Sequence, residues 1–338
     1  MFKITDKTKI YIVCPSNNKT GGTELLHQLV YELNSQRKQA FITYYYEGSS
    51  DRKNPTPDEF KKYINGYKML NEIEDFEDNV LILPEVCIGK HRMFNKLQKS
   101  VWWLSVDNFK VMIGKKSRYK NYGLKSFIKH LWLRDFNKYS DIKSIDRHLY
   151  QSYFAQNFLI NLGIDKNKTS YLSDYINDIY LSQNQDNNVE LKKNIVIYNP
   201  KKGKKFTDKL ISSSNNVKFI PIENMKNSQV IELMRSAKVY IDFGNHPGKD
   251  RIPREAAMSG CCIVTGRDGS ANFYNDVPIP DKYKFHCTES NIKEILETIT
   301  GCINNYEMEN LNFLQYRQFI SNEKNQFKND VLTIFKSL

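Results

Sequence analysis

The sequence lacks the patterns that would place it in several common protein classes. No apolar run reaches the roughly 18 residues that a membrane span needs, and the polar, charged start contains no stretch of signal-peptide length. The six cysteines show neither CxxC nor CxxH spacing, so they predict no zinc site and no dithiol redox site. We therefore expect a cytoplasmic protein with reduced thiols. Its 338 residues are 40% hydrophobic, which excludes a wholly disordered chain and suggests about two domains.

Positive charge is concentrated in one part of the chain. The net charge is +12, and residues 86–147 alone contain fifteen Lys or Arg and four Asp or Glu. Such a block suggests an anionic partner: phospholipid, nucleic acid, or an acidic or diphosphate-linked substrate. The alternative is a solvated basic face without a partner.

The same block, over residues 110–147, contains an apolar stripe at helical spacing. The stripe consists of Leu124, Phe127, Ile128, Leu131, Trp132, Phe136 and Tyr139. Basic residues lie beside it, and a basic amphipathic helix of this kind fits an anionic membrane surface. The stripe is equally compatible with a helix that packs on a core.

Short apolar runs alternate with helical patterns along the chain. The expected strands cover residues 9–14, 40–46, 79–84, 100–105, 168–172, 195–198, 217–221, 239–243 and 261–265. This alternation predicts an α/β fold with two parallel sheets. We expect a first domain over 1–181, a polar linker over 182–193, a second domain over 194–315, and a C-terminal helix over 316–338 that crosses back to the first domain. Ligands bind beyond the carboxyl ends of parallel strands, so the expected site is the cleft between the domains.

Residues 242–260, DFGNHPGKDRIPREAAMSG, are the segment richest in chemistry. They run from a strand through a glycine-containing loop into a helix. The backbone N–H groups at the helix start, with Lys249, Arg251 and Arg254, predict a site for an anion such as pyrophosphate. Glu255, expected in the first helical turn, is suited to accept hydrogen bonds from a ribose diol. The alternative is that its charge only complements the helix dipole.

The order of this segment resembles the donor-binding motif of the GT-B glycosyltransferases, in particular glycosyltransferase family 4. That pattern is a Glu, seven residues, and then Glu-Ala-Met-Ala-x-Gly before a strand, and residues 255–260, EAAMSG, fit its second half. The resemblance implies two Rossmann-like domains that face a cleft, with Glu255 on the ribose of a nucleotide sugar. The first Glu of the pattern is replaced by Pro247, and His246 and Asp250 are its nearest polar neighbours.

The resemblance extends to other loops. It implies that a glycine pair after the first strand, lysines after the strand at 195–198, and a glycine loop over 266–271 contact the donor. The donor-binding residues that we expect are Glu255, Arg254, Arg251, Lys249, Gly248, Lys202, Lys205, Gly21, Gly22 and Ser270.

The candidate catalytic residues are Asp107, Asp250 and His246. In an inverting reaction a general base must deprotonate the acceptor hydroxyl, and Asp107, after the strand at 100–105, is our first choice. An ordinary turn is the alternative at that position, and Glu24 and His27 are further candidates. In a retaining reaction the resemblance gives the leaving phosphate the role of base, and Asp250 would only position the substrate.

The sequence contains no Asp-x-Asp, the metal-binding signature of the GT-A transferase fold. This favours a metal-independent mechanism in which Lys, Arg and backbone N–H groups stabilise the departing diphosphate. We expect no metal and no cofactor; the nucleotide sugar is a substrate.

The leading hypothesis is a glycosyltransferase that moves a sugar from a nucleoside-diphosphate donor to a hydroxyl of a glycan or lipid-linked glycan. The resemblance suggests a role in bacterial surface polysaccharide synthesis, lipopolysaccharide or capsule, with a peripheral position on the inner face of the plasma membrane. A non-catalytic sugar-nucleotide-binding accessory protein is the first alternative, since the Glu at position 247 is missing. An epimerase on the same fold and a nucleic-acid-binding protein are the others, although no nucleic-acid-binding motif is present.

Overall fold

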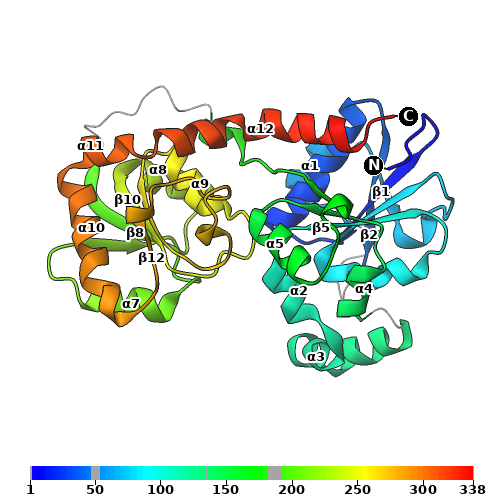
Figure 1. The fold of residues 1–338 in the computed structure, drawn as a ribbon, viewed down its shortest axis with the longest axis horizontal. Helices are drawn as coiled ribbons and strands as arrows, with labels where there is room; N and C mark the ends of the chain where they lie inside the picture. Colours follow the sequence, from blue (N-terminus) through cyan, green and yellow to red (C-terminus); the bar gives the residue numbers. More distant parts are fainter. Residues whose placement is uncertain (1, 47–53, 134–135, 182–191, 338) are drawn as a thin grey trace. The chain divides into compact units, whose positions relative to one another are not determined.

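The computed structural model describes residues 2–46, 54–133, 136–181 and 192–337. The chain forms two compact units (Figure 1). The N-terminal unit contains Met1–Gln151, Ala155–Asp174 and Asn325–Leu338, and the C-terminal unit contains Ser152–Phe154 and Tyr175–Lys324. Most of the expected linker, at 182–191, lies outside the described residues.

The N-terminal unit is built on a parallel seven-stranded sheet of order β3-β2-β1-β4-β5-β6-β7. Its strands are β1 (Lys9–Pro15), β2 (Gln39–Tyr45), β3 (Tyr67–Met69), β4 (Val80–Pro84), β5 (Gln98–Trp103), β6 (Arg147–Tyr150) and β7 (Thr169–Tyr171). Its helices are α1 (Gly21–Ser35), α2 (Val106–Met112), α3 (Gly114–Leu133), α4 (Tyr139–Lys143) and α5 (Tyr153–Asn161). Every residue of β4 is buried, as expected for a central strand with both faces covered. The strand order reverses between β1 and β4, which is where open parallel sheets bind ligands.

The C-terminal unit has a parallel five-stranded sheet of order β12-β11-β10-β8-β9. Its strands are β8 (Lys193–Tyr198), β9 (Lys218–Pro221), β10 (Ala237–Asp242), β11 (Cys262–Gly266) and β12 (Lys284–Phe285). Its helices are α6 (Asp178–Leu181), α7 (Lys204–Ser212), α8 (Asn227–Ser236), α9 (Arg251–Met258), α10 (Ile292–Asn304) and α11 (Tyr306–Leu311). Helices cover both faces of the sheet (Figure 1), as right-handed crossovers between parallel strands require.

The last helix, α12 (Leu314–Ile334), contributes side chains to the cores of both units. Its first half buries Tyr316 and Ile320 in the C-terminal core. Its second half brings Phe327 against Trp102 of β5, with ring centroids 6.4 Å apart. Among the described residues, no helix is both long and apolar enough to cross a membrane.

Candidate functional site

Three loops come together at the carboxyl edge of the C-terminal sheet. They follow the neighbouring strands β8, β10 and β11, and they cover residues 199–203, 243–250 and 267–270. We call them the β8, β10 and β11 loops. The β10 loop leads into α9, and the β11 loop leads into the 3₁₀ helix η6 (Gly269–Asn272), whose first two residues it includes. In parallel sheets this edge is the ligand-binding edge.

Glycines allow the three loops to touch at backbone level. Gly203 has φ = 58°, and a Cβ atom there would lie 2.3 Å from the carbonyl oxygen of Phe243. A Cβ atom on Gly244 would lie 2.5 Å from the Cβ of Lys202. Gly269 has φ = 60°, and a Cβ atom there would lie 2.0 Å from the carbonyl oxygen of His246. Only glycine fits these positions, so the loops form one rigid surface.

An ion network joins the β8 and β10 loops. The Nζ atom of Lys202 lies 2.5 Å from Oδ2 of Asp250, and the same oxygen lies 3.0 Å from Nδ1 of His246. The Nε2 atom of His246 lies 3.2 Å from Oγ1 of Thr265 and 3.6 Å from Oδ1 of Asp242. Two predicted catalytic residues and one predicted donor-binding residue are therefore in direct contact.

The hydrogen bonds and the nearby carboxylates of His246 favour the protonated form of its ring. The hydroxyl of Thr265 donates its only hydrogen to the carbonyl of Asp242, so it accepts from Nε2. The ionised carboxylate of Asp250 can only accept, so Nδ1 also carries a hydrogen. Burial lowers the pKa of His246, but the Asp250 hydrogen bond and the charges of Asp242 and Asp250 outweigh it, and the pKa is raised.

Asp250 shows the complementary shift. Burial raises the pKa of its carboxyl group. The hydrogen bond and charge of His246, together with the ammonium of Lys202, lower this pKa by more than burial raises it, so the pKa lies below its usual value. The network therefore alternates acidic and basic groups that stabilise each other's charged forms.

Asp242, His246 and Asp250 also form a cluster in which one ligand atom from each lies within 4.8 Å of the others. Protein groups already hold these atoms. The Tyr240 hydroxyl and the Gly244 N–H both donate to the Asp242 carboxylate at 3.0 Å. A cation at the cluster would have to compete with these contacts, which link the three residues to one another and fix the β10 loop.

Lys249 and Arg254, predicted to bind the donor, are buried against α12. The Lys249 ammonium lies 2.8 Å from Oε1 of Glu323, and Nη1 of Arg254 lies 2.7 Å from Oε2 of the same residue. Arg254 also donates to the carbonyls of Lys249 at 2.9 Å and Asp250 at 3.2 Å. We call these three charged residues the Glu323 triad. The two cations therefore connect the β10 loop and the start of α9 to α12. The sequence did not indicate Glu323, because it lies about seventy positions further along the chain.

Glu255 lies in α9, which begins at Arg251. The helix therefore starts earlier than Pro253, and Glu255 belongs to its second turn, not to the first as expected. The first turn contains no acidic residue. Dipole effects fade beyond the first turn, so the dipole interpretation of Glu255 loses its basis. Its half-buried side chain lies near Tyr180 of α6, whose pKa is raised by burial and by the charge of Glu255.

The remaining predicted donor residues of this unit lie on the same three loops or beside them. Ser270 is buried, its hydroxyl donates to the carbonyl of Gly248 at 2.6 Å, and its N–H donates to the carbonyl of His246 at 2.8 Å. The β11 loop thus supports the β10 loop. Lys205 is exposed in the first turn of α7, and Arg251 is half-buried in the first turn of α9.

In the N-terminal unit, Gly21 and Gly22 are the first two residues of α1, directly beyond the carboxyl end of β1. Thr20 caps this helix by accepting from the N–H of Thr23 at 3.2 Å. Asp107 lies in the first turn of α2, beyond β5, with its Oδ1 3.6 Å from the ammonium of Lys110. The predicted residues of this unit therefore occupy the carboxyl edge of its sheet.

The other N-terminal candidates have structural partners. His27 is buried, its Nε2 lies 2.6 Å from the Tyr44 hydroxyl, and burial lowers its pKa to about 4. Glu24 accepts a hydrogen bond from the Tyr63 hydroxyl at 3.0 Å. A residue that the sequence did not indicate is Glu85, which directly follows β4. It is buried, it accepts from the Leu104 N–H at 3.0 Å, and burial raises its pKa to about 7.

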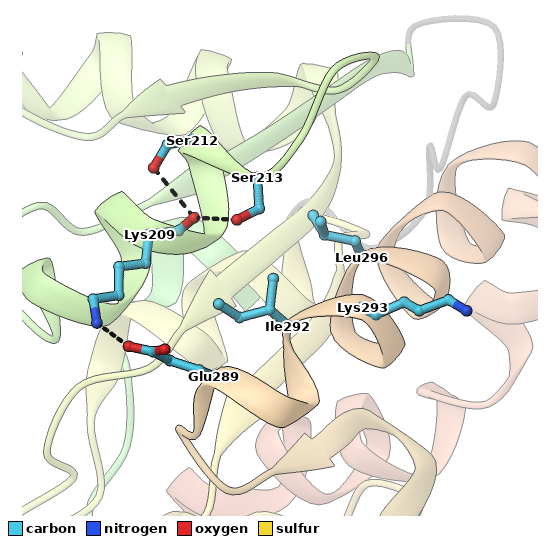
Figure 2. A pocket seen from close by; sticks show the side chains of 7 residues that line it. All are labelled: Lys209, Ser212, Ser213, Glu289, Ile292, Lys293 and Leu296. Atoms are coloured by element: carbon cyan, nitrogen blue, oxygen red, sulfur yellow. Dashed lines mark hydrogen bonds and ion pairs between the residues drawn. The ribbon is translucent and has the colours of Figure 1, made fainter.

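A separate pocket of about 630 Å³ lies between α7 and α10 (Figure 2). Ile292 and Leu296 form its apolar side, and Lys209 pairs with Glu289 at its edge. None of the residues predicted for the donor site lines it. Its charged side chains are largely exposed, and we assign it no function.

Known proteins with the same architecture support the fold. No protein-family model and no curated protein matches the sequence. A glycosyltransferase from Rickettsia africae is similar in structure over 98% of both chains, with 14% identity and a TM-score of 0.59. The Anabaena protein HepE, in complex with UDP and glucose, matches over 98% of this chain and 100% of its own, with 12% identity and a TM-score of 0.60. WaaG, a glycosyltransferase involved in lipopolysaccharide biosynthesis, matches over 96% and 99%, with 11% identity and a TM-score of 0.55. These likenesses and the two parallel sheets confirm the predicted α/β class with two Rossmann-like domains of the GT-B type.

Proposed function

We propose that this protein is a glycosyltransferase that uses a nucleoside-diphosphate sugar as donor. The observation that carries the proposal is the contact of three glycine-dependent loops at the carboxyl edge of the C-terminal sheet, one of which leads into the helix that contains Glu255 and the EAAMSG segment. An edge of this kind exposes backbone N–H groups to a diphosphate. The solved structures with the same fold include a glycosyltransferase from Rickettsia africae and the Anabaena protein HepE in complex with UDP and glucose.

In this proposal Glu255, in the second turn of α9, binds the ribose hydroxyls. Arg251 and the N–H groups at the start of α9 stabilise the diphosphate, together with Lys202 and Lys205 of the β8 side. Lys249, Arg254 and Ser270 position the loop, and Pro247 replaces the acidic residue that the resembling family has near the donor sugar.

The reaction transfers the sugar to a hydroxyl of a glycan or of a lipid-linked glycan. The bond between the anomeric carbon and the diphosphate oxygen breaks, a bond from that carbon to the acceptor oxygen forms, and the diphosphate leaves with the bonding electrons. The acceptor proton passes to Asp107 if configuration inverts, or to the leaving phosphate if it is retained. No step requires a metal ion. Bacterial surface polysaccharide synthesis is the proposed setting.

The test is a thermal-shift and turnover panel of nucleoside diphosphates and their sugars. A ligand at 100 times its dissociation constant should stabilise the protein by about 2.7 kcal/mol, so the cognate nucleotide should stand out. Glu255→Gln should remove most of this shift without lowering the melting temperature of the unliganded protein. The matched control is Glu297→Gln, on the exposed side of α10, which should bind like the wild type.

Two results would argue against the proposal. If no nucleotide shifts the melting temperature, the donor site is refuted. If a nucleotide binds through Glu255 but no donor is turned over, the accessory protein is the better assignment, and Pro247 is the feature that favours it.

A further inference from the structure

Strand β5 is joined to helix α2 by only two residues, Leu104 and Ser105. The place of α2, and of Asp107 in its first turn, therefore depends on the backbone of these two residues. We call them the β5 connection. It lies at the carboxyl edge of the N-terminal sheet, which is the edge where parallel sheets bind ligands.

Side chains from the two neighbouring strands hold the β5 connection. Glu85, directly after β4, accepts one hydrogen bond from the Leu104 N–H at 3.0 Å and another from the Ser105 N–H. Gln151, directly after β6, donates from Nε2 to the Leu104 carbonyl at 2.7 Å. The Ser105 carbonyl accepts from the Phe109 N–H of α2 at 3.2 Å. Every backbone polar group of the connection thus has a partner, and Glu85 and Gln151 provide all of these partners except Phe109.

The β5 connection also contacts the start of α1. A Cβ atom on Gly22 would lie 3.5 Å from Cδ1 of Leu104, so the Leu104 side chain lies directly beside Gly22. Ser105 continues the connection into α2, because its hydroxyl accepts from the Asn108 N–H at 3.1 Å and caps the helix. The connection therefore lies between a residue predicted to contact the donor and the predicted base Asp107.

Glu85 and Gln151 both cost the fold stability. Their exposed fractions are 2% and 4%. Burial raises the pKa of Glu85 to about 7, so its ionised form is less favourable in the folded protein than in the unfolded chain. The Oε1 atom of Gln151 is buried and has no hydrogen-bond partner among the described residues. Groups that are present although they weaken the fold are typical of functional sites.

We propose that Glu85 and Gln151 are positioning residues, which hold the β5 connection so that the Asp107 carboxylate meets the acceptor hydroxyl. The inference rests on the proposed function in its inverting form, in which Asp107 takes the acceptor proton. A carboxylate suits position 85 because its two oxygens accept from both N–H groups. An amide has only one oxygen, and it would place its own N–H groups against the second donor.

The test measures hydrolysis of a sugar nucleotide, in which water takes the place of the acceptor hydroxyl. The probe is the one among UDP-glucose, GDP-mannose and ADP-glucose that raises the melting temperature most. Glu85→Gln and Gln151→Met should each lower kcat about 10- to 100-fold, because an error of 1 Å in the place of a reacting group can lower a rate about 100-fold. Both variants should leave KM for the probe and its thermal shift unchanged, since every predicted donor-binding residue is still present.

A double-mutant cycle shows whether Glu85 acts through Asp107. Asp107→Asn should lower kcat by more than Glu85→Gln does. Adding Glu85→Gln to Asp107→Asn should lower kcat no further, because the group to be positioned is gone. At pH 8 Glu85→Gln should melt at no lower temperature than the wild type, because an amide carries no charge into the interior. Lost turnover without lost stability is a result that a purely structural role would not give.

The matched controls lie at the opposite end of the same strand. Asp75 accepts hydrogen bonds from the backbone N–H groups of residues 95–97, just before β5, at 2.8–3.0 Å. Gln98, the first residue of β5, exchanges hydrogen bonds with the backbone of Lys3. Asp75→Asn and Gln98→Met should leave kcat unchanged, because they alter the same kinds of contact at the edge that carries no predicted site residue.

The inference is overturned if Glu85→Gln keeps full turnover, if its effect adds to that of Asp107→Asn, or if the controls lose as much activity. A raised KM or a lost thermal shift in Glu85→Gln would also overturn it. A wild type that hydrolyses none of the probes would remove the proposed function and this inference together. An active wild type with an equally active Glu85→Gln variant would remove the inference alone.

Discussion

Removal of Glu323 alone should strongly destabilise the C-terminal unit, because it leaves two buried cations without their partner. Glu323 of α12 places one carboxylate oxygen 2.8 Å from the Lys249 ammonium and the other 2.7 Å from the Arg254 guanidinium, and all three side chains are buried. Glu323→Gln keeps the shape of the side chain but leaves two cations in a place that water does not reach. Removing one partner of a buried ion pair typically costs about 3–5 kcal/mol.

We expect a loss of about 3 kcal/mol, at the lower end of this range, because Arg254 keeps its bonds to the carbonyls of Lys249 and Asp250. Urea denaturation followed by circular dichroism measures the change. Glu297→Gln, which removes an exposed carboxylate 3.9 Å from Lys293, should change stability by less than about 1 kcal/mol.

Replacing all three members of the triad by apolar residues of similar size should recover most of the lost stability, since the cost of Glu323→Gln arises from unpaired charge and not from lost packing. A loss no larger than that of the exposed control, or an apolar triple variant as unstable as the single one, would refute the triad as the cause.

Two further predictions concern the loops and the pH response. Gly203→Ala should destabilise the protein by about 1–3 kcal/mol in urea denaturation, because Gly203 has a positive φ and the new methyl group would lie 2.3 Å from the carbonyl oxygen of Phe243. The control is Gly66→Ala, which should leave stability unchanged because no atom lies within 4 Å of the added methyl group. Equal effects of the two variants would contradict this explanation. Burial raises the pKa of Glu85 from 4.5 to about 7, so the folded state binds more protons than the unfolded state between these values and stability falls as the pH rises through them. Glu85→Gln should remove this contribution, and the difference between the wild-type and variant unfolding free energies across this pH window measures it; parallel pH profiles would show that Glu85 is not responsible.

The strand pattern could be predicted where apolar runs were long enough. The runs at 9–14 and 239–243 correspond to β1 and β10, since central strands of parallel sheets are buried on both faces. The strands β3, β6 and β12 were missed. They have three, four and two residues, and such short edge or near-edge strands depend on their neighbours for hydrogen bonds instead of on an apolar pattern.

At the candidate site, too, the sequence indicated some features and not others. Residue type and order alone indicated the anionic ligand, the glycine-containing loops and Glu255. They did not indicate that Lys249 and Arg254 face Glu323, because that contact joins positions about seventy residues apart. Nor did they show that His246 lies between Asp250 and Thr265, since only the packed loops set those distances.

The sequence by itself therefore determined the class of fold and the longer buried strands, because periodicity is a local property of the chain. Only the tertiary structure decided which charged side chains are buried in ion pairs and which are exposed to solvent. It turned two predicted ligand-binding cations inward and left Leu124, Ile128, Leu131 and Trp132 exposed, because burial depends on contacts between segments that no local pattern records.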